Sequence, residues 1–244
     1  MAGDRKAPAT TKGGGKVDTA SSRGEIDAFL AKARTMASAK PAGARGRLIF
    51  ALDATMSRQP TWDSACQLQA EMFNETAAIG GLEVQLIYFR GFNECRASRW
   101  VDDPSALAGL MTRIDCRGGH TQIRKGLART REESKKKPVQ ALVYIGDCME
   151  ESIDDLCAIA GEIGLTGTRV FMFHEGRDAI AERAFREIAR LTNGAYCRFD
   201  SGSAHQLREL LSAVAVYAAG GHKALADYGR KSGGQAQRLL EQLR

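Results

Sequence analysis

The sequence predicts an α/β fold: a doubly wound, mostly parallel central sheet flanked by helices, with one antiparallel edge strand. Three observations support this prediction. Short apolar segments that fit buried strands alternate with longer segments of helical periodicity along most of the chain. Two of the apolar segments end directly in acidic or hydroxyl residues, which is where such sheets place their binding sites. Residues 93–101 intersperse charged residues with apolar ones, which favours an exposed hairpin strand.

The first half of the chain predicts a strand, a helix, a second strand and the edge hairpin. Residues 47–52 form an apolar run too short for a helix. A helix begins at Pro60, because proline favours the first turn, and ends at Gly80–Gly81. A strand at 82–89 leads to the hairpin, and a short helix follows at 104–114.

The second half continues the alternation. Gly118–Gly119 opens a helix at 123–137, and Pro138 separates that helix from an apolar strand at 139–145. The remaining predicted elements are a helix over 153–163, a strand at 168–174, a helix at 178–191, a strand at 195–199 and a helix at 203–219.

Composition divides the chain into four parts. We expect a disordered basic tail at 1–23, a helix and linker at 24–46, the α/β domain at 47–219 and, at 220–244, a mobile extension that ends in a short helix. Residues 1–47 hold ten Lys/Arg and four Asp/Glu, so the whole net charge of +6 lies there and the rest of the chain is neutral. A nucleic-acid-binding face on the folded domain is therefore not predicted.

The same composition predicts a soluble, cytoplasmic protein that does not bind membranes. No apolar run approaches the roughly 20 residues that span a bilayer, and no apolar signal segment follows Met1. The six cysteines have no Cys-x-x-Cys spacing, so we interpret them as free thiols.

Oxygen ligands follow the first predicted strand. Asp53, Thr55 and Ser57 stand at alternate positions, so one carboxylate and two hydroxyls can converge on one small cation from a single loop. Taken alone, such a cluster equally fits a surface turn. Two further stretches favour the metal: Thr121 follows the Gly118–Gly119 loop, and Asp147 ends the apolar strand at 139–145.

Together these three stretches resemble the metal-ion-dependent adhesion site of the von Willebrand factor type A family. That family carries Asp-x-Ser-x-Ser in its first loop, a Thr after glycines in its second and an Asp at a strand end in its third. The matching positions are Asp53, Thr55, Ser57, Thr121 and Asp147, within a resemblance that covers residues 47–219. The chain departs from the pattern at Thr55, which replaces the first Ser, and at Met56 and Cys148, which stand where glycine is common.

The resemblance implies a non-enzymatic, cation-dependent protein-interaction module. Mg²⁺ is the expected cofactor and Mn²⁺ the alternative. Neutral hydroxyls would leave the ion short of negative charge, so a partner protein that presents an Asp or Glu would complete its shell. Met56, His120 and Cys148 would form the rim that this partner meets. Bacterial members are often linked to AAA-type ATPases or stress-response complexes, and no residue here chooses among them.

Three alternatives stay open. Asp53 could serve a Mg²⁺-dependent phosphatase of the haloacid dehalogenase type, but that chemistry needs a second carboxylate where Thr55 stands. The basic tail could make the chain a ribonucleoprotein adaptor. The acidic stretch at 150–155 fits the first turn of a helix, with a second cation site as the alternative.

Overall fold

The structure is a computed structural model that describes residues 45–78, 80–199, 204–232 and 234–243. The basic tail expected at 1–23 and the helix expected at 24–40 lie outside these residues. Within the described ranges, no helix combines the length and apolar character needed to cross a membrane.

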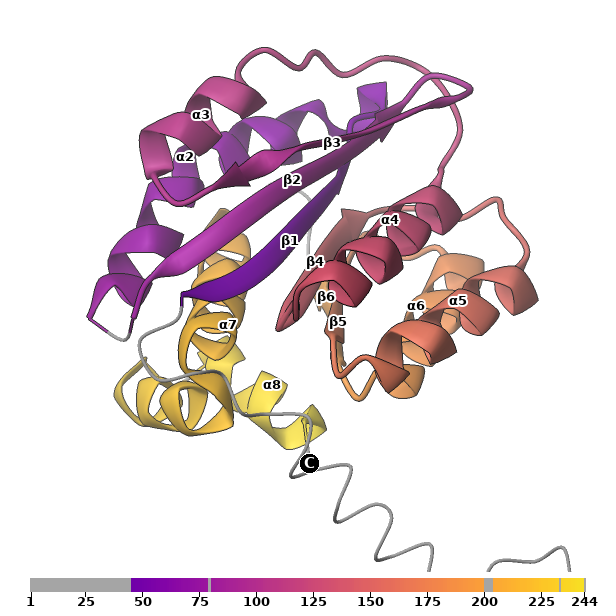
Figure 1. Cartoon of the computed structure of the whole chain (residues 1–244). Helices are drawn as coiled ribbons and strands as arrows, with labels where there is room; N and C mark the ends of the chain where they lie inside the picture. The colour runs from indigo at the N-terminus through magenta and orange to yellow at the C-terminus, as the bar shows by residue number, and fades with distance from the viewer. Residues whose placement is uncertain (1–44, 79, 200–203, 233, 244) are drawn as a thin grey trace, which may run out of the picture. The chain divides into compact units, whose positions relative to one another are not determined.

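Six strands form one sheet in the described part of the chain, in the spatial order β3-β2-β1-β4-β5-β6 (Figure 1). The strands are β1 (Gly46–Asp53), β2 (Leu82–Arg90), β3 (Glu94–Val101), β4 (Ala141–Gly146), β5 (Arg169–Glu175) and β6 (Ala195–Phe199). All neighbouring pairs are parallel except β2 and β3, which form an antiparallel hairpin. The predicted doubly wound, mostly parallel sheet with one antiparallel edge strand is confirmed.

The two central strands, β1 and β4, decide where a site can form. The chain builds outward from β1 to β2 and β3, then crosses back to β4 and continues through β5 to β6. Parallel strands put their carboxyl ends at the same edge, and the reversal between β1 and β4 leaves their loops free of a crossing connection. Asp53 ends β1 and Asp147 directly follows β4.

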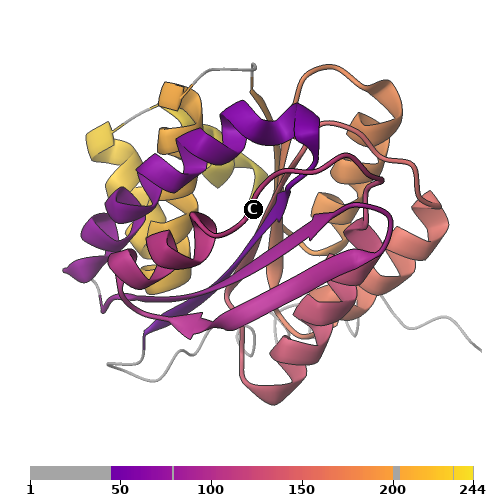
Figure 2. The same ribbon diagram turned by 90° about the horizontal axis from the view of Figure 1, so that it is seen from above.

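Helices cover both faces of the sheet. They are α2 (Gln59–Ala77), α3 (Pro104–Met111), α4 (Ile123–Lys136), α5 (Ile153–Leu165), α6 (Ala179–Leu191), α7 (Ala204–Ser232) and α8 (Gly234–Gln242). Seen from above, α2, α3, α7 and α8 lie on one side and α4, α5 and α6 on the other (Figure 2). Side chains alternate across β1, so Phe50 joins the first core and Ile49 the second.

The C-terminal region differs from the expected mobile extension. Helix α7 continues past Ala219 to Ser232, with a break in helical geometry at Gly221, and α8 follows it. Leu225, Leu239 and Leu243 are buried in the core that α2 and α7 share. The apolar residues after 219 are few, but each one is placed on the inward side of a helix, so they complete that core.

Helix α8 also contacts the outer edge of the sheet. The side-chain amide of Gln242 accepts a hydrogen bond from the Tyr196 N–H at 2.8 Å and donates one to the Tyr196 carbonyl at 3.0 Å. Because β6 has no further strand beside it among the described residues, this amide pairs backbone groups that would otherwise face solvent.

Candidate functional site

The first loop turns sharply after β1. The Thr55 N–H donates to Asp53 Oδ1 at 2.8 Å, a local side-chain bond that is typical of Asp at a turn. Residues Met56–Arg58 then form a short 3₁₀-helix, η1, that leads directly into α2. The side chain of Asp53 is buried, with the residue 2% exposed, so its carboxylate faces the protein interior at the sheet edge rather than bulk water.

Hydrogen bonds join the first loop to the loop after β4. Thr55 Oγ1 lies 3.3 Å from Ser57 Oγ, and Ser57 Oγ donates to Asp147 Oδ2 at 3.1 Å. Four of the five predicted ligand residues are therefore brought together by the fold, although Asp53 and Asp147 stand far apart in sequence.

Each of the two carboxylates keeps one buried oxygen with no hydrogen-bond partner. These oxygens are Asp53 Oδ2 and Asp147 Oδ1. The pKa of Asp53 is raised to about 6, chiefly by burial and less by the nearby charge of Asp147, while hydrogen bonds from Thr55 and the charge of Arg58 oppose the shift. Buried carboxylate oxygens normally have partners, so this pair fits a site that takes a cation.

Thr121 lies on the adjacent loop, and its polar atoms are bonded to Glu150 rather than to the other four residues. The Thr121 N–H donates to Glu150 Oε2 at 3.1 Å, and the Glu150 N–H donates to Thr121 Oγ1 at 3.3 Å. Glu150 follows Asp147 by three residues, so this reciprocal pair fixes the Thr121 loop against the Asp147 loop. The threonine hydroxyl accepts only a long bond there, which leaves it able to serve a cation as well.

The neighbouring Glu151 caps a helix. Its carboxylate accepts from the N–H groups of Ile123, at 2.5 Å, and Arg124, at 3.1 Å. The residue before helix α4, Gln122, makes no capping bond of its own, so Glu151 supplies the acceptor that the first turn lacks. Asp154 and Asp155 lie in the first turn of α5, as the helix interpretation of this acidic stretch predicts.

Sequence reasoning missed a buried arginine at the centre of the site. Arg58 is 3% exposed, and its Nη1 lies 3.3 Å from Asp147 Oδ2. Its Nη2 pairs with the carboxylate of Glu175 at the end of β5 and donates to Thr61 Oγ1 at 2.5 Å. Glu175 is also buried. Two features of the sequence could have pointed to this pair. Arg58 directly follows Ser57, and Glu175 ends an apolar strand.

A buried histidine supports the Asp147 backbone from β5. His174 Nε2 lies 3.2 Å from the Asp147 carbonyl oxygen, and Nδ1 lies 2.9 Å from the Tyr196 hydroxyl. Burial lowers the pKa of His174, against a smaller raising effect from the bond to Asp147. A neutral ring that donates to the carbonyl fits this geometry, and it holds the Asp147 loop to the sheet.

The predicted rim residues differ in exposure. Met56 is 62% exposed, and the ring of His120 is exposed, 3.1 Å from Glu150 Oε2 and 5.2 Å between centroids from the ring of Phe92. Cys148 is half-buried, and burial, followed by the charge of Asp147, raises the pKa of its thiol to about 12. Cys148 is thus a protonated thiol and not a nucleophile.

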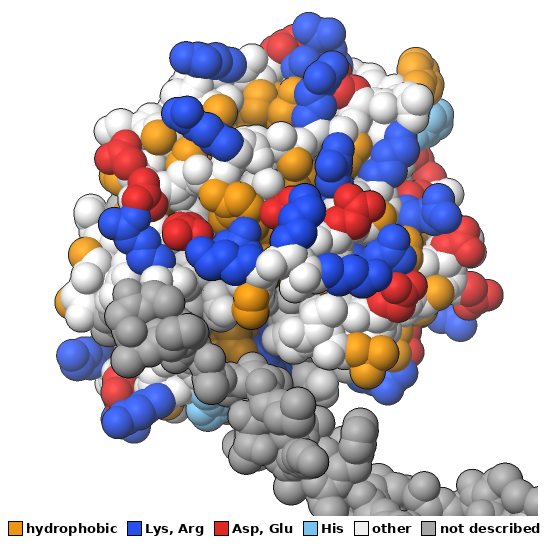
Figure 3. Space-filling view, in the orientation of Figure 1, with side chains coloured by type: hydrophobic (Ala, Val, Ile, Leu, Met, Phe, Trp, Pro, Cys, Tyr) orange, Lys and Arg blue, Asp and Glu red, His pale blue; other side chains and the backbone are white. Residues whose placement is uncertain are grey.

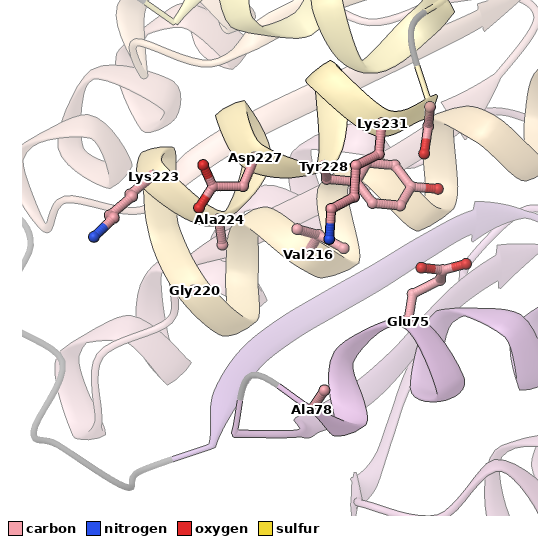
Figure 4. Close-up of a pocket in the computed structure, with 10 residues that line it drawn as sticks. Glu75, Ala78, Val216, Gly220, Lys223, Ala224, Asp227, Tyr228 and Lys231 are labelled. Atoms are coloured by element: carbon pink, nitrogen blue, oxygen red, sulfur yellow. The ribbon is translucent and has the colours of Figure 1, made fainter.

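Among the described residues, no three His, Cys, Asp or Glu side chains lie close enough together to hold a metal ion by themselves. The five predicted ligands are a different kind of set, with two carboxylates and three hydroxyls. A cavity of about 680 Å³ lies elsewhere, between α2 and α7, where Glu75 faces Tyr228 and Lys231 (Figure 4). The candidate site is therefore the edge where β1 and β4 end.

Comparison with known proteins gives no relative by sequence. No family model matches the chain, and no curated protein matches it. Solved structures do match. The SpRpn10 VWA domain has a TM-score of 0.53 and 14% identity, and the match covers 71% of this chain and 95% of that one.

Two further structures are similar. An aerotolerance-related membrane protein from Bacteroides fragilis matches with a TM-score of 0.53 and 18% identity over 68% of this chain and 96% of that chain. Proximal thread matrix protein 1 from the mussel byssus, with a zinc-occupied MIDAS motif, matches with a TM-score of 0.54 and 16% identity over 70% of this chain and 45% of that one. At these identities the likeness concerns the fold alone: the chain has the fold of a von Willebrand factor type A domain.

Proposed function

We propose that the chain is a protein-interaction module that binds a divalent cation and, through it, a carboxylate of a partner protein. The ligand set is the one that the resemblance implies: Asp53, Thr55, Ser57, Thr121 and Asp147. Mg²⁺ is the proposed cation, with Mn²⁺ as the alternative. The partner presents an Asp or a Glu to the rim formed by Met56, His120 and Cys148.

The observation that carries this proposal is the pair of buried, unpartnered oxygens, Asp53 Oδ2 and Asp147 Oδ1. A buried carboxylate oxygen without a partner is costly, and two of them on joined loops make the cost larger. A hard cation satisfies both at once. The Thr55 hydroxyl is bonded to the Ser57 hydroxyl, and the Ser57 hydroxyl is bonded to Asp147. The two hydroxyl oxygens and the Asp147 carboxylate are therefore already close enough together to bind one small ion.

The charges around the site leave room for a divalent ion. Arg58 and Glu175 pair with each other, so their charges cancel to first order. Asp53 and Asp147 then contribute two negative charges when ionised. One divalent cation neutralises both carboxylates. Because the hydroxyl ligands are neutral, the cation still attracts a further carboxylate from a partner.

The fold neighbours support a divalent cation without choosing which one. The mussel byssus protein is described with zinc in its MIDAS motif. The five proposed ligands offer only carboxylate and hydroxyl oxygens, which Mg²⁺ and Mn²⁺ prefer.

The site supports binding rather than catalysis. Covalent catalysis needs a nucleophile with a base beside it. The candidate base, His120, is exposed and lies against Glu150, and the candidate nucleophile, the Cys148 thiol, has a pKa raised by burial. Thr55 also occupies the position where phosphoryl transfer of the haloacid dehalogenase type needs its second carboxylate. We therefore propose no enzymatic activity.

Calorimetric titration with MgCl₂ and MnCl₂ tests the proposal on three proteins: the unmodified chain, Asp53→Asn and Asp63→Asn. Asp63 is an exposed residue of α2 that accepts a bond from Gln59, so its variant is the matched control. We expect saturable binding by the unmodified chain and by Asp63→Asn, and none by Asp53→Asn. Equal heats for all three proteins, or no binding by any of them, would overturn the cation site.

A further inference from the structure

A groove of about 610 Å³ lies beside the candidate cation site. It runs between the β2–β3 turn, the loop at Arg117–Gly118 and the exposed side of α4. Four arginines line it, and we name it the arginine groove after them: Arg90, Arg96, Arg117 and Arg129. Figure 3 shows the face that carries β3 and α4, where Lys and Arg side chains gather with acidic ones between them.

Backbone contacts make this groove continuous with the site. The Arg117 N–H donates to the Ala54 carbonyl at 2.9 Å, and Ala54 stands between Asp53 and Thr55. The His120 N–H donates to the Gly91 carbonyl at 3.1 Å, which ties the Thr121 loop to the β2–β3 turn. A chain that reaches the cation therefore passes along the arginine groove without leaving the protein surface.

The groove keeps an excess of positive charge. Glu94 bonds to Arg90 and Arg96, at 2.9 and 3.0 Å, and Asp115 bonds to Arg90 and Arg117, at 2.6 and 2.7 Å. Two carboxylates thus serve three arginines. Arg129 is exposed, and no carboxylate of the described residues lies within ion-pairing distance of it. With both carboxylates counted, the four arginines leave a net charge of +2.

The exposed arginines are accessible to a ligand. Arg90 is buried, and its hydrogen bond to Glu94 raises its pKa, so it is committed to the fold. Arg96 and Arg117 remain 71% and 59% exposed in spite of their bonds. From α4, Arg129 lines the groove and Lys125 donates to the Asn93 side chain in the β2–β3 turn.

An exposed aromatic ring stands at the end of the groove. Phe92 is 79% exposed at the tip of the β2–β3 turn. The turn is held in place, because Gln122 donates to the carbonyls of Arg90 and Gly91, at 3.2 and 3.3 Å. Gly119 packs so closely that a Cβ there would come within 2.1 Å of the Gly91 carbonyl oxygen. A large apolar side chain on a fixed turn is typical of a binding surface.

We propose that the arginine groove binds an acidic segment of a partner protein, with Phe92 contacting an apolar residue of that segment. This proposal deepens the proposed function, because it makes the cation-bound carboxylate one of several acidic residues in the same partner. A short acidic segment fits better than nucleic acid, since a net charge of +2 is small for a surface that must neutralise a run of phosphates.

The test measures fluorescence anisotropy of a labelled hexaglutamate peptide with the full chain, first in EDTA and then in Mg²⁺. The test variant is Arg96→Gln/Arg129→Gln. The matched control is Lys135→Gln/Arg183→Gln, which removes two exposed charges from α4 and α6 outside the groove and leaves the basic N-terminal residues unchanged. In EDTA we expect the test variant to bind about three- to tenfold more weakly than the unmodified chain, and the control to change by less than about twofold.

Asp53→Asn separates this proposal from the cation site. The affinity of each protein for hexaglutamate in EDTA is the reference for its own response to Mg²⁺. In Mg²⁺ the unmodified chain gains affinity and Asp53→Asn gains none. If Mg²⁺ has no effect on either protein while the groove variant still binds more weakly, the arginine groove stands and the cation-dependent function fails.

Three results would overturn the groove proposal. The first is no binding of hexaglutamate in EDTA. The second is equal weakening by the control and test variants, which would mean diffuse attraction to a basic chain. The third is tighter, groove-dependent binding of a thymidine oligonucleotide, which would assign the groove to nucleic acid. Circular dichroism of each variant verifies that the fold is intact.

Discussion

Arginines meet carboxylates at two places along the same edge of the sheet, and the two places differ in burial. Arg58 is enclosed with Glu175 and Asp147, whereas the arginine groove leaves Arg96 and Arg117 largely exposed. An enclosed charge depends on its partner, because it has lost water, while an exposed charge is screened and exchanges partners readily. The buried group therefore fixes the geometry of the cation site, and the exposed group is available to other molecules.

The largest expected effect comes from breaking the buried pair. Arg58→Met leaves the Glu175 carboxylate buried without a cation, so we expect the free energy of unfolding to fall by about 3 to 5 kcal/mol. Urea denaturation measures this loss. Arg190→Met is the matched control, because the Arg190–Glu187 pair on α6 is exposed to solvent, and its loss is expected to leave the free energy of unfolding nearly unchanged.

A double variant sharpens the same comparison. Arg58→Met/Glu175→Gln removes both charges, so it should recover most of the stability that Arg58→Met loses. If the double variant is as unstable as the single one, packing around Arg58 rather than charge explains the loss.

The next effect is the pH dependence of the cation-free protein. The pKa of Asp53 is about 6 in the folded chain against an ordinary value of 3.8, so the folded state holds its proton more tightly than the unfolded state does. The contribution of Asp53 to the free energy of unfolding is therefore largest below about pH 4. It falls by about 3 kcal/mol in total as the pH rises through about 6.

Urea denaturation in EDTA from pH 4 to pH 7 checks this dependence, with Asp53→Asn as the variant that lacks the group. The contribution of Asp53 is the difference between the two proteins at each pH. A difference that does not change with pH would contradict the prediction, because it would mean that the pKa of Asp53 is the same in the folded and unfolded chain.

The smallest effect concerns the exposed arginines. Asp115→Asn removes the carboxylate that bonds Arg90 and Arg117, so the net charge of the arginine groove rises by one. We expect hexaglutamate to bind about threefold more tightly and the free energy of unfolding to stay nearly unchanged. Anisotropy and urea denaturation measure the two. Weaker hexaglutamate binding would mean that Asp115 positions the arginines instead of neutralising them.

The fold and part of the site were predictable because they depend on local patterns. Strand ends are visible in sequence, and parallel strands bring their carboxyl ends together, which is enough to pair Asp53 with Asp147. The doubly wound sheet follows from the same alternation. The ligand role of these residues stays a prediction, since joining Ser57 to Asp147 by a hydrogen bond does not show a cation.

The residues that sequence reasoning missed depend on which elements become neighbours. Arg58 reaches Glu175 only because η1 faces the end of β5, and no spacing rule encodes that contact. Thr121 stays a predicted ligand, but its bonds to Glu150, which tie two loops together, were not foreseen from the sequence. The region after 219 was expected to be mobile because its apolar residues are sparse, and sparse residues such as Leu225 and Leu239 are buried when a core offers room for them.

The Gln242 amide beside β6 has a consequence for how partners can bind. Open sheet edges invite an incoming strand, which adds by backbone hydrogen bonds and needs little sequence complementarity. At Tyr196 both of those bonds are already made by a side chain of α8. Strand addition at this part of β6 is therefore blocked from within the chain.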